Sequence, residues 1–259
     1  MSDRTHRLLT CIICQKPYDV PPGKNVTSFG SAKYDLDMKM NLNYADAELL
    51  KRIYWTDSHC PQCFITEAAL DIEENARFQA QRRRQVREDR WPKLCPPLFR
   101  EIDVSKLPTT YPATLERVMA WQMGPKGLIL SGITGKGKTR AAWQLLKRLH
   151  FEGVHIRAFD CVDFAHECQT AFTDFKGEGW AKNVAAAELV FFDDFGKNKM
   201  TDRVEVELFG VIDRRMAHQL PIIVTTNDIG STLEARLSPD RGAPLVRRLR
   251  ECCESIAFV

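Results

Sequence analysis

The most constraining feature of this sequence is a glycine-rich stretch near its middle. Residues 132–139 read GITGKGKT and match the pattern G-x-x-x-x-G-K-[ST] at every position. An apolar segment precedes the stretch, and apolar residues at helical spacing follow it. The glycines let the chain turn with its N–H groups facing inward, and the start of a helix adds positive potential there. The sequence therefore predicts a strand, a phosphate-binding loop and a helix, in that order.

This loop predicts binding of a nucleoside triphosphate, with ATP as the expected cofactor. Lys138 is expected to reach the β- and γ-phosphates, and the Thr139 hydroxyl to bind Mg²⁺. The alternative, a flexible glycine loop that matches by chance, does not explain the strand and the helix on either side. The residues expected to contact the nucleotide are Gly132, Thr134, Gly135, Lys136, Gly137, Lys138 and Thr139.

A second apolar run, residues 188–192, ends in two carboxylates, Asp193 and Asp194. Ligands of parallel sheets lie at the carboxyl ends of the strands, so both side chains are expected near the loop. Asp193 is assigned to Mg²⁺, directly or through water. Asp194 is assigned the role of polarising the attacking water. A surface turn after a buried strand is the alternative, and the phosphate-binding loop upstream argues against it.

Five strand candidates alternate with helical patterns from residue 94 to the end of the chain. This alternation predicts an α/β domain with a parallel sheet. The fourth candidate is followed by Thr226 and Asn227, and the Asn227 amide is placed to orient the water or to contact the γ-phosphate. Capping of a turn before Asp228 is the alternative, and the residues alone favour it. The candidates are residues 127–131, 154–159, 188–192, 221–225 and 254–259.

Two Cys-x-x-Cys pairs near the N-terminus, Cys11 with Cys14 and Cys60 with Cys63, predict a Zn²⁺ site. The intervening residues 15–59 exceed the usual spacing, so an insertion within a zinc-ribbon-like unit is expected. His59 is a possible substitute for Cys60. We expect a structural zinc, because so small a unit with few apolar residues needs a metal or another cross-link to stabilise its fold. Unrelated buried or free thiols are the alternative. The remaining cysteines, which have no such spacing, are Cys95, Cys161, Cys168, Cys252 and Cys253.

Composition divides the chain into a zinc-binding N-terminal domain (1–70), a basic helical linker (71–93) and an ATPase domain (94–259). The net charge of +3 is too small to imply nucleic-acid binding by itself. The linker helix, however, concentrates arginines, which either contact DNA phosphates or form a solvated surface. The sequence has no apolar run of membrane-spanning length and no signal peptide, so we expect a cytoplasmic protein without a membrane partner.

The loop, the Asp-Asp pair and the strand that ends in Thr-Thr-Asn together resemble the AAA+ ATPases of the DnaC/IstB group. Residues 94–100 (LCPPLFR), 208–215 and 220–227 also resemble the pattern of this group, and the resemblance covers residues 94–259. It implies a five-stranded AAA+ core without a helical lid, which assembles into a homo-oligomer, often on DNA, with ATP at subunit boundaries. Asn227 then corresponds to the sensor-1 residue. Arg248 corresponds to the arginine finger that enters a neighbour's site, with Arg247 as second choice.

The resemblance leaves more than one function open. A helicase loader would bind and hydrolyse ATP with Mg²⁺, contact single-stranded DNA and engage a replicative helicase. Loaders similar to DnaI carry a zinc-containing N-terminal domain, although the cysteine spacing here differs from theirs. An IstB-like transposition regulator would instead assemble on duplex DNA and recruit a transposase. A zinc adaptor with an inactive nucleotide site is a third class, and the intact Lys138, Asp193 and Asp194 argue against it.

Overall fold

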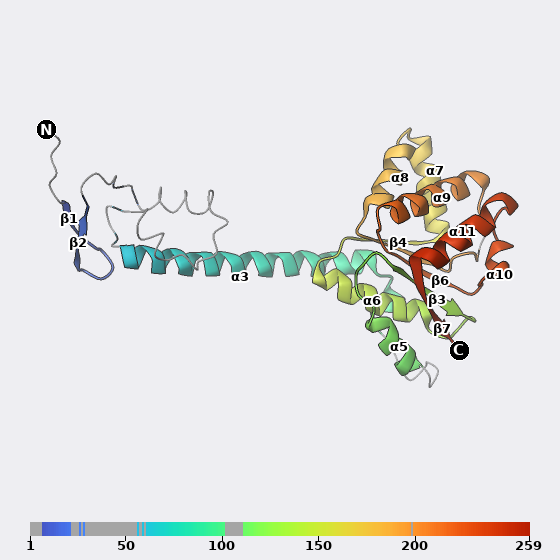
Figure 1. Ribbon diagram of the computed structural model, residues 1–259, viewed down its shortest axis with the longest axis horizontal. Coiled ribbons are helices and arrows are strands. Elements are labelled where there is room, and N and C mark those ends of the chain that lie inside the picture. The colour runs from blue at the N-terminus through green and yellow to red at the C-terminus, as the bar shows by residue number, and fades with distance from the viewer. Residues whose placement is uncertain are drawn as a thin grey trace. The chain divides into compact units, whose positions relative to one another are not determined.

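The computed structural model describes residues 7–21, 26, 28, 56, 59, 61–101, 111–197 and 199–259 (Figure 1). The chain divides into two compact units, Met1–Arg83 and Arg84–Val259. The boundary lies within helix α3 (Pro61–Leu94), which the sequence prediction had placed at residues 71–93. Among the described residues, none of the helices combines the length and the apolar character needed to cross a bilayer.

The second unit contains a five-stranded parallel sheet in the order β4-β5-β6-β3-β7. Central strands of such a sheet are covered on both faces, so they are almost uniformly apolar. The predicted fold class is confirmed, and each predicted strand is present with its ends moved by at most two residues. The strands are β3 (Gly127–Gly132), β4 (Ile156–Asp160), β5 (Leu189–Asp193), β6 (Ile222–Thr226) and β7 (Cys253–Phe258).

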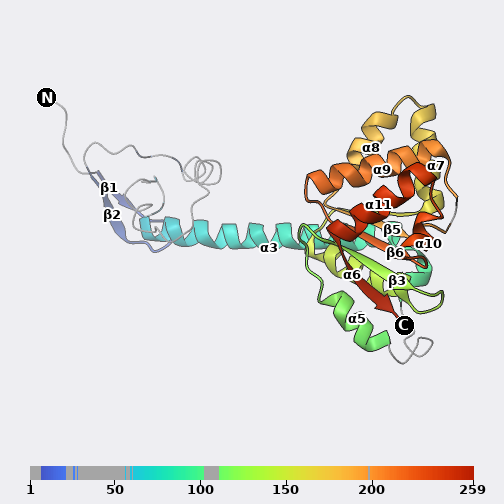
Figure 2. The ribbon, with the colours of Figure 1, turned by 45° about the vertical axis from the view of Figure 1, so that its right-hand side comes forward.

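Alternate side chains of each strand enter two separate cores, one on each face of the sheet. Leu189 and Phe191 of β5 pack with Trp143 of α6, whereas Val190 and Phe192 pack on the opposite face. Helices α5 (Tyr111–Met119) and α6 (Lys138–Glu152) cover the first face, together with the last turns of α3. The remaining long helices cover the opposite face of the sheet (Figure 2). They are α7 (Cys161–Thr173), α8 (Gly177–Ala186), α9 (Asp202–Ala217) and α11 (Pro239–Cys252).

A buried arginine of α9 connects the elements on the second face of the sheet through hydrogen bonds. The side chain of Arg215 is fully buried, and its guanidinium donates hydrogen bonds to four main-chain carbonyls of the described residues. Burial lowers its pKa to about 10, so it remains charged at neutral pH. Its five donors in a fixed fork suit this task, which a lysine with one nitrogen cannot fulfil. The acceptors are Ala185, Ala187, Glu188 and Pro221, at the end of α8 and the starts of β5 and β6.

Two short helices complete this unit, α4 (Pro97–Arg100) and α10 (Ser231–Glu234). The start of α11 is fixed by the buried carboxylate of Glu205 on α9. Its two oxygens each accept a hydrogen bond from the N–H of Ser238, the residue that precedes the helix, at 3.2 Å. A carboxylate at this end is favoured because the N-terminal N–H groups lack partners within the helix.

The first unit contains an antiparallel hairpin of β1 (Arg7–Thr10) and β2 (Pro17–Val20). Cys11 and Cys14 lie in the turn between the strands. Cys11, Tyr18 and Val20 form a small core, and Cys63 from the first turn of α3 packs against it. Helix α3 begins earlier than the sequence prediction because Pro61 occupies its first position, where proline is well tolerated.

Candidate nucleotide and metal sites

The phosphate-binding loop connects β3 to α6 and has the backbone that its glycines allow. Gly132 has φ 145°, and a Cβ there would lie 2.2 Å from the carbonyl oxygen of Phe258 on β7. Only glycine fits such an approach. Gly135 and Gly137 also have positive φ, 85° and 88°, which is the left-handed region. The loop therefore turns directly into the N-terminus of α6, as the motif predicts.

Lys138 is the first residue of α6, and its side chain lies inside the loop, only 5% exposed. Its ammonium donates to the carbonyl oxygens of Gly132 at 2.8 Å and Ile133 at 2.9 Å. A third bond, at 2.8 Å, reaches the side-chain oxygen of Asn227. Burial lowers the pKa of Lys138, and the nearby Asp194 and Asp193 oppose this shift. The structure thus brings Asn227 to the loop. The turn at Asp228 is capped instead by the Thr226 hydroxyl, which donates to the Asp228 carbonyl and accepts from the Asp228 N–H.

Asp193 lies at the end of β5 and accepts two hydroxyl hydrogen bonds. Thr139 donates to its Oδ1 at 2.8 Å, and Thr225 of β6 donates to the same oxygen. Burial raises the pKa of Asp193, and the two hydroxyls act in the opposite direction. A carboxylate and a hydroxyl in contact are the hard oxygen ligands that Mg²⁺ prefers. The donor set of Asp193 and Thr139 therefore fits this ion.

Asp194 adopts a left-handed conformation, with φ 51°, directly after β5. Its main-chain N–H donates to the Thr225 hydroxyl at 2.8 Å. Its side-chain Oδ2 accepts a hydrogen bond from Lys197 at 2.7 Å. The thiol of Cys161 donates to its carbonyl at 3.5 Å. The two carboxylate groups thus accept hydrogen bonds from different side chains, although they are adjacent in the sequence.

Thr225 is a residue of this site that the sequence analysis missed. Its buried hydroxyl connects the Asp193 carboxylate with the Asp194 main chain, so it positions both. The signal was a threonine in a buried and largely apolar strand, where a hydroxyl needs a partner.

The two predicted finger residues lie on α11 in different surroundings. Arg248 pairs with Asp213 of α9 and lies over the ring of Phe209, 4.4 Å from its centroid. Its side chain is 27% exposed, whereas that of Arg247 is 71% exposed. Arg247 is 3.7 Å from Glu251 of the same helix, an exposed pair that holds it weakly.

In the first unit, the thiols of Cys11, Cys14 and Cys63 have sulfur atoms within 4.8 Å of one another. Three thiols at this separation fit the ligand set of a tetrahedral Zn²⁺ ion. Cys60, the fourth predicted ligand, lies outside the described residues. His59, the alternative ligand, is buried.

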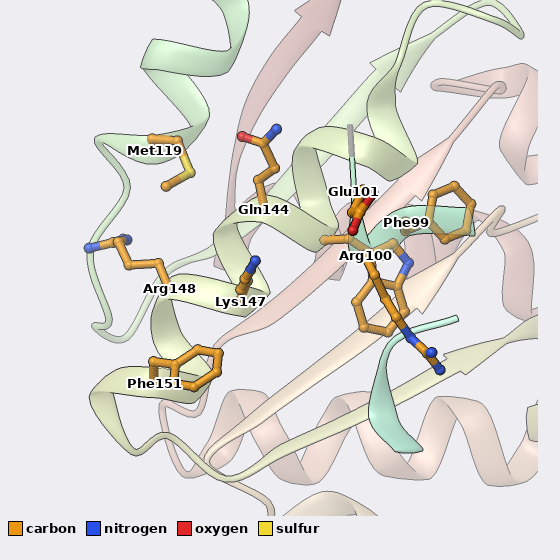
Figure 3. Close-up of a pocket in the computed structure, with 9 residues that line it drawn as sticks. Phe99, Arg100, Glu101, Met119, Gln144, Lys147, Arg148 and Phe151 are labelled. Carbon is orange, nitrogen blue, oxygen red and sulfur yellow. The ribbon is translucent and has the colours of Figure 1, made fainter. Parts of the chain in front are cut away.

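A separate pocket of about 580 Å³ lies on the α6 side of the second unit. Figure 3 shows Gln144, Lys147 and Arg148 from α6 and Met119 from α5 along its wall. None of the predicted nucleotide-binding residues lines it.

The model of the family described as IstB-like ATP binding protein matches residues 58–238. The chain belongs to this family. A family of ATP-binding proteins supports ATP as the ligand of the phosphate-binding loop, and the AAA+ resemblance of the DnaC/IstB group is confirmed. No curated protein matches the chain.

Among solved structures, DnaI is 18% identical over 64% of this chain and 95% of its own, with a TM-score of 0.53. The DnaC helicase loader is 22% identical over 66% of this chain and 99% of its own, with a TM-score of 0.49. DnaA bound to AMPPCP and single-stranded DNA is 16% identical over 57% of this chain, with a TM-score of 0.46. This chain spans only 44% of that DnaA chain. At such identities the likeness to DnaI establishes a shared fold.

The Thr225 hydroxyl generates a stability prediction. Replacing Thr225 with valine keeps the side-chain volume but leaves the Asp194 N–H without its acceptor. Such a buried, unsatisfied group costs about 1–3 kcal/mol, so we expect the free energy of unfolding to fall by that amount. Urea denaturation measures this change in the free energy of unfolding. Thr225→Ser, which keeps the hydroxyl, is the matched control and is expected to lose about 1 kcal/mol or less. Equal losses in both variants would contradict the role of the hydroxyl.

Proposed function

We propose that this protein is a Mg²⁺-dependent ATPase that loads a replicative helicase onto single-stranded DNA. The observation that carries the ATPase part is the convergence of five side chains at the carboxyl edge of the sheet. Lys138 and Thr139 come from the first turn of α6, Asp193 and Asp194 from the end of β5, and Asn227 from the residue after β6.

In this proposal each side chain has a distinct task. Lys138 neutralises the β- and γ-phosphates, and Asn227 orients the γ-phosphate or the water beside it. Thr139 and Asp193 hold Mg²⁺, which supplies charge neutralisation during phosphoryl transfer. Asp194 accepts a proton from the attacking water. This role suits its carboxylate, which is adjacent to Asp193 but does not accept the hydroxyl hydrogen bonds that Asp193 accepts.

Two substitutions separate binding from hydrolysis. Lys138→Ala removes the charge that faces the phosphates, so we expect nucleotide binding to be lost. Asp194→Asn removes only the carboxylate that polarises water, so binding should persist while kcat falls by about 10²–10⁴-fold. Fluorescent nucleotide binding and phosphate release measure the two effects. Normal turnover by Asp194→Asn would place the catalytic carboxylate elsewhere.

The loader role rests on the resemblance to the DnaC/DnaI group, on the N-terminal cysteines and on one exposed surface. DnaC, one of the structural neighbours, is named as a helicase loader, and the cysteine-containing first unit resembles the DnaI type.

Phe175, in the turn between α7 and α8, is 99% exposed and has φ 57°. An exposed aromatic ring next to a cation, Lys176, is suited to stack on an unpaired base while the ammonium meets a phosphate. We place single-stranded DNA at this turn, in addition to the arginines of α3.

We expect the replicative helicase from the same genome to co-purify with the full-length chain when ATP is present. Phe175→Ala should retain the helicase but bind single-stranded oligonucleotides about tenfold more weakly, since one base stack contributes about 1–3 kcal/mol. Val162→Ala, which shortens another exposed apolar side chain, is the matched control. Preference for duplex DNA together with retention of a transposase would instead support the IstB-like transposition role.

We propose further that ATP is hydrolysed between copies of this chain, with an arginine of α11 supplied by the neighbour. The sequence favoured Arg248, but Arg247 would reach a second copy without breaking a contact to another helix. A guanidinium there would neutralise charge on the transferred phosphoryl group.

A mixing experiment tests this arrangement. Arg247→Ala and Arg248→Ala are each combined with Lys138→Ala, and ATP hydrolysis is measured in each mixture. The variant that lacks the true finger should be slow alone and regain activity in the mixture, because its intact loop meets an intact finger. Trans-acting fingers contribute about 10³–10⁵ in rate, so even partial rescue is measurable. A failure of both pairs to recover, in oligomers shown to be mixed, would contradict a trans finger on α11.

We propose a structural Zn²⁺ in the first unit, held by Cys11, Cys14 and Cys63 with Cys60 as the fourth ligand. Elemental analysis should find one zinc per chain in the purified protein. Cys63→Ser should lose the metal and the fold of this unit together, because metal binding and folding are coupled in small zinc units. Cys252→Ser, in the other unit, should keep the zinc. A protein purified without zinc would overturn the site.

A further inference from the structure

The lysine that contacts Asp194 has no assigned task in the proposed mechanism. Lys197 lies three residues after Asp194 in a tight turn, and its main-chain N–H donates to the Asp194 carbonyl at 3.1 Å. Its ammonium donates to Oδ2 of the same residue at 2.7 Å. Gly196, with φ 86°, forms the turn, and a Cβ there would lie 2.5 Å from a methyl group of Leu233. The backbone therefore directs Lys197 back onto Asp194.

The ammonium of Lys197 faces a group of carboxylates at the ends of β4 and β5. Asp194 raises the pKa of Lys197 most, through the hydrogen bond and through its charge, and Asp193 and Asp160 add to the effect. Lys138 faces Asp193 and Asp194 as well, from a buried position inside the loop. The side chain of Lys197 is, by contrast, 60% exposed. It can leave Asp194 without disturbing the core.

The contact matters because Asp194 is the carboxylate proposed to accept a proton from water. An oxygen that accepts a hydrogen bond from an ammonium is less available to the water. We propose that Lys197 is a positioning residue that restrains Asp194: it competes with the attacking water for this carboxylate and keeps hydrolysis slow until the ion pair opens. This inference rests on the proposed ATPase function.

The restraint is small in size, as a reversible control requires. Ion pairs between exposed groups are weak, so an anion that attracts the exposed ammonium can open this one. Complete removal of the pair should therefore raise the rate about two- to fivefold. This direction is opposite to that expected for a lysine that assists the reaction or only maintains the fold.

The experiment measures steady-state ATP hydrolysis by the full-length chain. Lys197→Ala should raise kcat about two- to fivefold with the KM for ATP unchanged, since the lysine contacts Asp194 and not the loop. Lys197→Arg, which restores a cation, should return kcat to the wild-type value. Lys199→Ala is the matched control, because Lys199 is an exposed lysine two residues away, and it should leave kcat unchanged. A kcat for Lys197→Ala that is unchanged or lower would overturn the restraint.

Asp194→Asn separates failure of this inference from failure of the proposed function. If Asp194→Asn is inactive while Lys197→Ala is not faster, only the restraint is wrong. If Asp194→Asn hydrolyses ATP normally, the proposed catalytic role of Asp194 is wrong, and the restraint fails with it. The double variant Lys197→Ala with Asp194→Asn provides one more criterion. It should be as slow as Asp194→Asn, and a rate increase in it would show that Lys197 acts through some other group.

Discussion

The parallel direction of the five strands is the constraint on which the candidate nucleotide site depends. Because all carboxyl ends meet at one edge, β3, β5 and β6 deliver the loop, the two aspartates and Asn227 to the same place. The hydrogen bond from Lys138 to Asn227 joins residues 89 positions apart, and that from Thr139 to Asp193 joins residues 54 apart. No local segment of the chain could assemble this site without the sheet.

At this edge of the sheet, hydroxyl groups give the two neighbouring aspartates different surroundings. Thr139 and Thr225 both donate to Asp193, so its charge is balanced by neutral donors in a buried setting. The Asp194 side chain is 32% exposed, and a lysine balances its charge. Hydrogen bonds are stronger in the less polar interior, whereas exposed ion pairs are screened by water. The same side-chain type is therefore held firmly at one position and loosely at the next.

The sequence was sufficient to predict the strands, the loop and the fold class, because these follow from short-range patterns of apolar residues and glycines. It did not reveal Thr225 or Lys197, since their importance depends on contacts that form only after folding. Arg215 was similarly hidden, because an arginine near the end of a helix normally lies on the surface, and only burial on the sheet gives it carbonyl partners. The start of α3 was missed because a proline can begin a helix as well as end one.

The binding mode of Arg215 has a consequence for how this protein can change over time. Its guanidinium contacts main-chain oxygens, which every amino acid provides, so the hydrogen bonds themselves do not depend on the side chains at 185, 187, 188 and 221. These hydrogen bonds therefore survive any substitution at the four positions that keeps the backbone path, and at the buried Ala185 and Ala187 it is core packing that limits the change. Arg215 itself has no such freedom, since no other side chain offers the same fork of donors. As far as these hydrogen bonds are concerned, selection at this junction of α8, β5 and β6 should act on the codon of residue 215 alone.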